Sequence, residues 1–123
     1  MTGEARAVPR DALHGLREQT EGVIAAMADD LDAVVHASSN ANADDEHDPE
    51  GTTIAFERAQ LLALLGSARR ELIEIDSALG RVESGSYGRC EACGTDVGAE
   101  RLLARPAARH CVGCASTHRR PVT

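Results

Sequence analysis

Residues 54–82 read IAFERAQLLALLGSARRELIEIDSALGRV, and the spacing of the apolar residues in this stretch decides the fold. The apolar positions step by four and three in alternation, at Leu61, Leu65, Ala68, Leu72, Ile75, Leu79 and Val82. A repeat of about 3.5 residues, kept over three heptads, is typical of a helix whose apolar seam packs against a partner helix. The same spacing extends the seam upstream to Arg58 and Ile54. The stretch therefore predicts one helix of a coiled coil.

Residues at both ends indicate where this helix begins and ends. Asp48, Pro49 and Glu50 are typical of a helix start, because a carboxylate can cap the first turn and proline lacks only an N–H that this turn does not use. Ser84 is the expected last residue, since Gly85 can adopt the left-handed conformation that follows many helices. We expect the periodic helix to cover residues 53–84.

The nearest partner for this helix lies upstream in the chain. Residues 10–37 predict another helix, with its seam at Leu13, Leu16, Thr20, Val23, Met27, Leu31 and Val34. At about 1.5 Å per residue the two helices would measure roughly 42 and 48 Å, and matched lengths favour an antiparallel hairpin. A homodimeric coiled coil without a hairpin is the alternative. Residues 10–84 are thus predicted to form a long antiparallel two-helix coiled-coil hairpin.

The segment between the two helices predicts an acidic tip. Residues 38–52 break the periodicity with Ser, Asn, Asp, Pro and Gly, and they contain neither Lys nor Arg. Their acids are Asp44, Asp45, Glu46, Asp48 and Glu50. Residues 1–9 and 116–123 have no periodicity, so we expect both ends of the chain to be flexible.

Size and composition exclude several classes of protein. A chain of 123 residues corresponds to one domain or one elongated unit, and an aromatic content of 2% with no Trp makes a ring-lined ligand pocket hard to build. No apolar run approaches the ~20 residues of a membrane span, and the N-terminus does not resemble a secretory signal. A cytoplasmic protein without a membrane partner is expected.

Charge is distributed unevenly along the chain. Residues 1–86 hold 7 Arg and 17 acids, a net of −10, whereas residues 87–123 hold 6 Arg and 3 acids, a net of +3. Nonspecific binding to nucleic acid depends on neutralising phosphates with Lys and Arg, so the acidic body disfavours it. Scarce aromatic residues also make a nucleic-acid-binding zinc ribbon the weakest interpretation. A basic protein surface or a metal centre is the better partner.

The chain's four cysteines form two Cys-x-x-Cys pairs, Cys90 with Cys93 and Cys111 with Cys114, separated by 17 residues. This spacing is typical of a tetrahedral zinc site, and in a cytosolic chain it favours metal over disulfides. Four thiolates close the coordination shell, which predicts a structural zinc ion and no catalysis. An iron site, a thiol redox pair, or His110 in place of one thiolate are the alternatives.

The bulky apolar residues after Tyr87 are few, so a small four-cysteine zinc-finger module at residues 85–115 should depend on its metal. Ordering the backbone costs about 1–2 kcal/mol per residue, whereas structural zinc contributes roughly 10–16 kcal/mol in small fingers. The sequence predicts a mostly α-helical protein, in which this module follows the hairpin.

The residues around the cysteines resemble the DksA/TraR family. The resemblance rests on GSYGRCEACG at residues 85–94, on Val97, Arg101-Leu102 and Ala104-Arg105-Pro106, and on CVGC at residues 111–114. It extends upstream through the hairpin to about residue 10. It implies a zinc-binding transcription regulator that binds bacterial RNA polymerase, inserting the coiled coil through the secondary channel so that the acidic tip nears the catalytic magnesium. Such a protein is no enzyme and does not itself read DNA sequence.

The resemblance also implies roles for single residues. The family's tip pattern, Asp-x-x-Asp-x-Ala, is similar to residues 45–50, so Asp45 and Asp48 are the candidate tip contacts, while Glu50 stands where the family has alanine. Arg105 matches a basic residue used for guanosine tetraphosphate or polymerase contact, but Glu74 and Ala115 stand at the corresponding other positions. We therefore expect weak or no dependence on this nucleotide. A zinc-thiolate redox sensor, or a zinc-stabilised interaction module without polymerase activity, is the alternative function.

Overall fold

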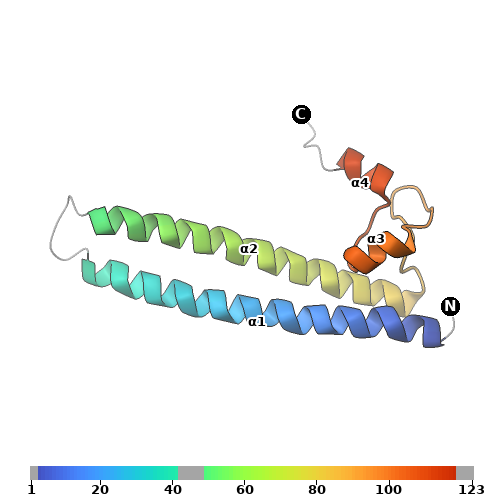
Figure 1. Cartoon of the computed structure of the whole chain (residues 1–123), viewed down its shortest axis with the longest axis horizontal. Coiled ribbons are helices and arrows are strands. Elements are labelled where there is room, and N and C mark those ends of the chain that lie inside the picture. The colour runs from blue at the N-terminus through green and yellow to red at the C-terminus, as the bar shows by residue number, and fades with distance from the viewer. Residues whose placement is uncertain (1–2, 42–48, 119–123) are drawn as a thin grey trace. The chain divides into compact units, whose positions relative to one another are not determined.

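The structure of this chain is a computed structural model, which describes the backbone of residues 3–41 and 49–118 and the side chains of residues 9–37 and 51–117. It contains the helices α1 (Gly3–Ala41), α2 (Pro49–Ser84), α3 (Ala99–Ala104) and α4 (Val112–His118), labelled in Figure 1. Within the described ranges there is no strand, only an isolated antiparallel bridge between Arg89 and Asp96. The predicted fold class, mostly α-helical with two long helices and a small four-cysteine module, is confirmed.

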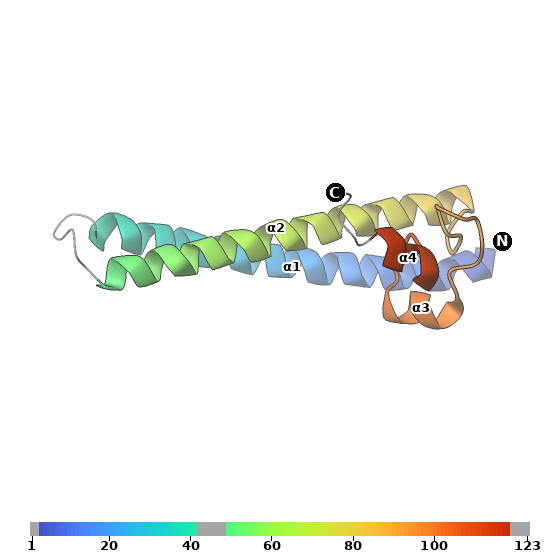
Figure 2. The ribbon, with the colours of Figure 1, turned by 90° about the horizontal axis from the view of Figure 1, so that it is seen from above.

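The chain divides into two compact units. The first combines Met1–Arg17 with Ile73–Thr123, and the second is Glu18–Leu72. Each unit contains part of α1 and part of α2, which run side by side in opposite directions (Figures 1 and 2). None of the helices, over the residues that are described, is both long and apolar enough to cross a bilayer.

The core of the first unit lies where the start of α1 meets the end of α2. Leu13, Ile75, Ala78 and Val82 are at most 1% exposed, and the half-buried side chains packed against them are Leu16, Leu79, Tyr87 and Ala107. Tyr87 and Ala107 come from the C-terminal module, so this module adds a third layer over the helix pair.

The second unit has a thinner core. Its buried side chains among the described residues are Thr20, Leu65 and Ala68. The predicted seam of α2 is confirmed from Leu61 to Val82, because each of its seven residues is buried or half-buried, whereas Arg58 is exposed.

The prediction that Val23 lies in the α1 seam is wrong. Val23 is 44% exposed and its neighbour Ile24 is half-buried. The seam steps from Thr20 by four residues to Ile24 and then by three to Met27, which is an equally regular coiled-coil spacing.

Both long helices extend beyond the periodic segments. Residues 3–9, predicted as a flexible end, belong to α1, because Glu4, Ala5 and Ala7 favour helix and Pro9 removes one N–H donor without ending it. Residues 38–41 and 49–52 of the predicted tip are helical as well, which leaves residues 42–48 outside the described part.

The predicted end of α2 at Ser84 is confirmed, whereas its start lies at Pro49, four residues before the predicted residue 53. The helix begins at Pro49 and ends at Ser84, and Gly85 follows with a φ of 83°. The N–H of Ser86 donates to the carbonyl of Arg81 at 2.9 Å, which closes the last turn. Residues 116–118, predicted as part of a flexible end, instead form the last turn of α4.

Candidate metal centre

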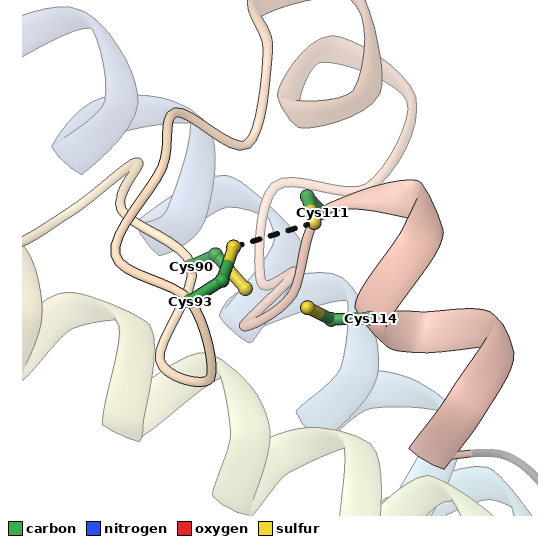
Figure 3. A group of neighbouring side chains, drawn as sticks. All are labelled: Cys90, Cys93, Cys111 and Cys114. Carbon is green, nitrogen blue, oxygen red and sulfur yellow. Dashed lines mark hydrogen bonds between the residues drawn. The ribbon is translucent and has the colours of Figure 1, made fainter.

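Four cysteine side chains of the first unit converge on one point (Figure 3). The sulfur atoms of Cys90, Cys93, Cys111 and Cys114 all lie within 4.8 Å of one another, and those of Cys93 and Cys111 are 3.8 Å apart. Tetrahedral ligation with Zn–S bonds of ~2.3 Å requires sulfur atoms about 3.8 Å apart. The donor set and its spacing therefore fit a zinc ion. Among the described residues this group consists of cysteines alone, without His110.

The first cysteine pair is held by a tight turn. The N–H of Gly94 donates to the carbonyl of Cys90 at 2.9 Å, and the N–H of Cys90 donates to the carbonyl of Thr95 at 2.8 Å. Gly94 has a φ of 75°, a conformation that residues with a Cβ rarely adopt. The Thr95 hydroxyl lies 2.8 Å from the Cys93 sulfur and can donate to its thiolate.

The second pair lies at the beginning of α4. Cys111 precedes the helix and Cys114 lies in its first turn, where the N–H of Ala115 donates to the carbonyl of Cys111 at 2.8 Å. The segment leading to Cys111 is attached to α3, because the Nε of Arg101 donates to the carbonyl of His110 at 2.8 Å. Short-range contacts thus fix each pair separately.

The electrostatics of the four thiols favour a bound cation. The backbone N–H of Cys111 is the main cause that lowers the pKa of Cys90 to about 5. The pKa of Cys114 rises to about 12, chiefly through its hydrogen bond to Cys111 and then through those to Cys90 and Cys93. Thiols this close to one another cannot all ionise unless a positive ion compensates the negative charge of the thiolates. A divalent metal supplies that charge.

The two cysteine pairs are also linked by an ion-pair cluster that we call the Glu91 clasp, made of Glu74, Arg81, Glu91 and Arg109. The N–H of Glu91 donates to the carbonyl of Arg109 at 2.9 Å, and the guanidinium of Arg109 lies 3.3 Å from both carboxylate oxygens of Glu91. Arg109 also donates to Glu74 on α2. Because Glu91 follows Cys90 and Arg109 lies two residues before Cys111, the clasp connects both pairs to α2.

Arg81 is the buried member of the clasp. Its side chain is 10% exposed and lies 3.6 Å from a Glu91 oxygen. It donates to the hydroxyl of Ser77 at 2.9 Å and to the carbonyl of Ala107 at 3.3 Å. Burial is the main cause that lowers the pKa of Arg81, against the opposing effect of Glu91. Arg81 was not predicted from the sequence, although an arginine beside the apolar positions Leu79 and Val82 was a signal for it.

The remaining predicted site residues have different surroundings. Arg105 is exposed, and its backbone N–H donates to the carbonyl of Arg101 at 2.7 Å at the end of α3. Glu74, at one of the positions compared with the family's nucleotide contacts, is paired with Arg109. Asp45 and Asp48 lie outside the described residues.

Comparison with known protein families identifies the C-terminal module. The family described as the prokaryotic dksA/traR C4-type zinc finger matches residues 85–120. Together with the convergence of the four sulfur atoms, this match confirms the zinc predicted from the sequence.

Curated proteins match longer parts of the chain. The RNA polymerase-binding transcription factor DksA of Caulobacter vibrioides (strain NA1000 / CB15N) is 44% identical over 64 residues, which cover 52% of this chain and 45% of that protein. The protein of the same name from Escherichia coli (strain K12) is 41% identical over 46 residues, or 37% of this chain and 30% of that protein. The chain thus spans less than half the length of these curated relatives.

A solved structure matches almost the whole chain. The transcription factor DksA2 from Pseudomonas aeruginosa has a TM-score of 0.78 and 25% sequence identity, and the match covers 95% of this chain and 84% of that one. With the zinc-finger match and the curated relatives, it confirms the resemblance to the DksA/TraR family that the cysteine motifs indicated.

Proposed function

We propose that this chain, whose C-terminal module is a DksA/TraR-type C4 zinc finger, regulates transcription by binding bacterial RNA polymerase. The observation that carries the proposal is the convergence of four cysteine sulfurs within 4.8 Å in a module that follows a helical hairpin. The curated relatives named as RNA polymerase-binding transcription factors support the same partner. A location in the cytoplasm, where polymerase acts, is part of the proposal.

The zinc ion has a structural role in this proposal. Cys90, Cys93, Cys111 and Cys114 would hold it, and four protein ligands leave no open position for water or substrate. The chain therefore acts by contact and is not an enzyme. Zinc keeps the two cysteine pairs and the Glu91 clasp together, which fixes the module against the ends of α1 and α2.

The tip between α1 and α2 is the part that would act inside polymerase. Residues 38–52 carry five acids and neither Lys nor Arg, so they would present negative charge toward the catalytic magnesium after entry through the secondary channel. Asp45 and Asp48 are the proposed contacts. The carboxylate of Glu74 is occupied by Arg109 and would repel phosphates, which supports little or no dependence on guanosine tetraphosphate.

The partner is tested by pull-down with core RNA polymerase. The zinc-loaded chain is expected to retain core polymerase, and chelation of zinc is expected to reduce the retained amount at least about tenfold, because the module loses its fold. Restoring zinc should restore binding, which controls for damage to the chain. If the zinc-loaded chain retains no polymerase, the proposed function is wrong.

The tip is tested by transcription in vitro. We expect Asp45→Ala with Asp48→Ala to leave polymerase binding within about twofold and to abolish the change in transcript yield, because only the charge near the catalytic centre is removed. The control is Asp29→Ala with Asp32→Ala, which removes two exposed acids from α1 and should preserve the effect. Guanosine tetraphosphate added to the same assay should have little influence. Normal regulation by the tip variant would contradict the assignment.

A further inference from the structure

The apolar seam between α1 and α2 is covered to different degrees in the two units. In the first unit Leu13, Ile75 and Val82 are at most 1% exposed, because Tyr87 and Ala107 pack over the helix pair. In the second unit no side chain is buried within residues 21–37 or within residues 51–64. In this part of the second unit only α1 and α2 pack together, without the third layer that Tyr87 and Ala107 add in the first unit. Its apolar seam is therefore incompletely covered.

A groove lies between α1 and α2 in this half of the second unit, with a volume of about 500 Å³. Its apolar wall is formed by Ala33, Val34, Leu61 and Leu64, and Leu64 is 46% exposed. The polar residues that line it are Asp30 on α1 and Glu57 and Gln60 on α2. The groove therefore combines an apolar surface with two carboxylates and has no basic residue in its lining.

We propose that this groove binds an amphipathic helix of another protein, one that carries Lys or Arg beside its apolar residues. The apolar side chains of that helix would pack on Val34, Leu61 and Leu64, and would supply the third layer that the second unit lacks. Its basic side chains would reach Asp30 and Glu57. An amphipathic helix that binds in such a groove uses apolar anchors spaced by three or four residues.

Charge complementarity identifies this occupant. Residues 18–37 of α1 contain neither Lys nor Arg, and the groove places a carboxylate from each helix beside apolar surface. Lys and Arg can lay their aliphatic stems along such a surface while the charged end reaches a carboxylate. A cationic partner would also be drawn toward a segment of high negative charge, which raises the association rate.

A second copy of this chain fits the groove poorly. Residues 1–86 have a net charge of −10, so two copies that met through their grooves would bring carboxylates together. Like charges placed opposite each other across an interface disfavour association. Binding of the basic amphipathic helix to this groove does not require polymerase.

The probe is a synthetic helical peptide of Leu, Lys and Ala with one apolar face, about 20 residues long, or some 30 Å. It carries a fluorescent label and is titrated with the zinc-loaded full chain at about 0.15 M salt, where screening limits diffuse attraction to ~8 Å. A scrambled peptide of the same composition, which has no apolar face, should bind at least about fivefold more weakly.

Variants of the groove locate the site. Asp30→Asn with Glu57→Gln should weaken binding of the amphipathic peptide about fivefold, since two exposed charge pairs are lost. Leu64→Ala should weaken it about fivefold through lost apolar contact. The matched control, Asp29→Asn with Asp32→Asn, removes the same charge from exposed positions of α1 that do not line the groove, and should stay within about twofold. Circular dichroism should show equal helix content in all variants.

Three results would overturn the inference. An equal loss in the control variant would mean that only diffuse negative charge attracts the peptide. Unchanged binding in the groove variants would place the peptide elsewhere. A concentration-dependent dimer in sedimentation equilibrium that Leu64→Ala dissociates would make a second copy the occupant. Since this titration contains no polymerase, its outcome and that of the polymerase pull-down can differ.

Discussion

Removal of zinc is expected to unfold residues 85–118 while long parts of α1 and α2 remain helical. The two short helices of this region, α3 and α4, have 6 and 7 residues, and α3 buries none of its side chains. Helices of this length are unstable in water without tertiary contacts. A structural zinc ion contributes roughly 10–16 kcal/mol in small fingers, which exceeds the total stability of many domains. This is the largest effect that a single change should have on the protein.

Hydrogen exchange measured by mass spectrometry, before and after chelation, would follow this unfolding. Peptides from residues 85–118 should lose protection completely, and peptides around Leu13 and Ile75 should lose part of it, because Tyr87 and Ala107 no longer cover them. Cys114→Ser should reproduce the result with a stoichiometry of zinc near zero. Ser116→Ala, an exposed position on the same helix, is the matched control and should keep zinc and protection. Persistent protection without zinc would contradict the structural role of the metal.

Arg81→Met is expected to lower the free energy of unfolding by about 2–3 kcal/mol. The side chain of Arg81 is 10% exposed, and its loss leaves the Ser77 hydroxyl and the Ala107 carbonyl without this donor. Breaking a fully buried ion pair costs about 3–5 kcal/mol, and the value here is smaller because Glu91 is 40% exposed and keeps Arg109 as a partner. Methionine retains most of the buried volume, so the change reports on polar contacts.

Arg17→Met supplies the control for this prediction. Arg17 also pairs with a carboxylate in the first unit, that of Asp76 at 2.7 Å, but the two side chains are 38% and 50% exposed. Exposed pairs contribute little, so this substitution should change stability by no more than about 0.5 kcal/mol. Urea denaturation of both zinc-loaded variants gives the comparison. Equal losses for Arg17 and Arg81 would mean that burial does not distinguish the two ion pairs.

The parts of the fold that sequence could predict depend on patterns with a fixed period. The α2 seam was predictable from Leu61 to Val82, since heptads translate directly into one helix face. The cysteine site was predictable for a similar reason, because two Cys-x-x-Cys turns at this separation leave few other arrangements. The end of α2 at Ser84 followed from Gly85, whose backbone preference is local.

Other features depend on contacts that no local pattern records. The Glu91 clasp joins Glu74, Arg81, Glu91 and Arg109, which are separated by up to 35 positions in the sequence. Other arginine and glutamate residues occur along the chain, so residue type alone does not indicate which of them pair. The choice between Val23 and Ile24 for the α1 seam required knowledge of how the two helices meet, since both spacings satisfy a coiled coil. The start of α1 before Arg10 was missed because residues 1–9 have no apolar periodicity, although they join the helix.

The position of Tyr87 makes the protein its own optical reporter. It is the single tyrosine of a chain that has no tryptophan, and its hydroxyl donates to the carbonyl of Pro106 at 2.8 Å while its ring packs on the core at the end of α2. Near-ultraviolet absorbance and intrinsic emission therefore come almost entirely from one ring at the junction between hairpin and metal-binding region. Assembly of that junction can be followed in unlabelled protein, without background from tryptophan or a second tyrosine.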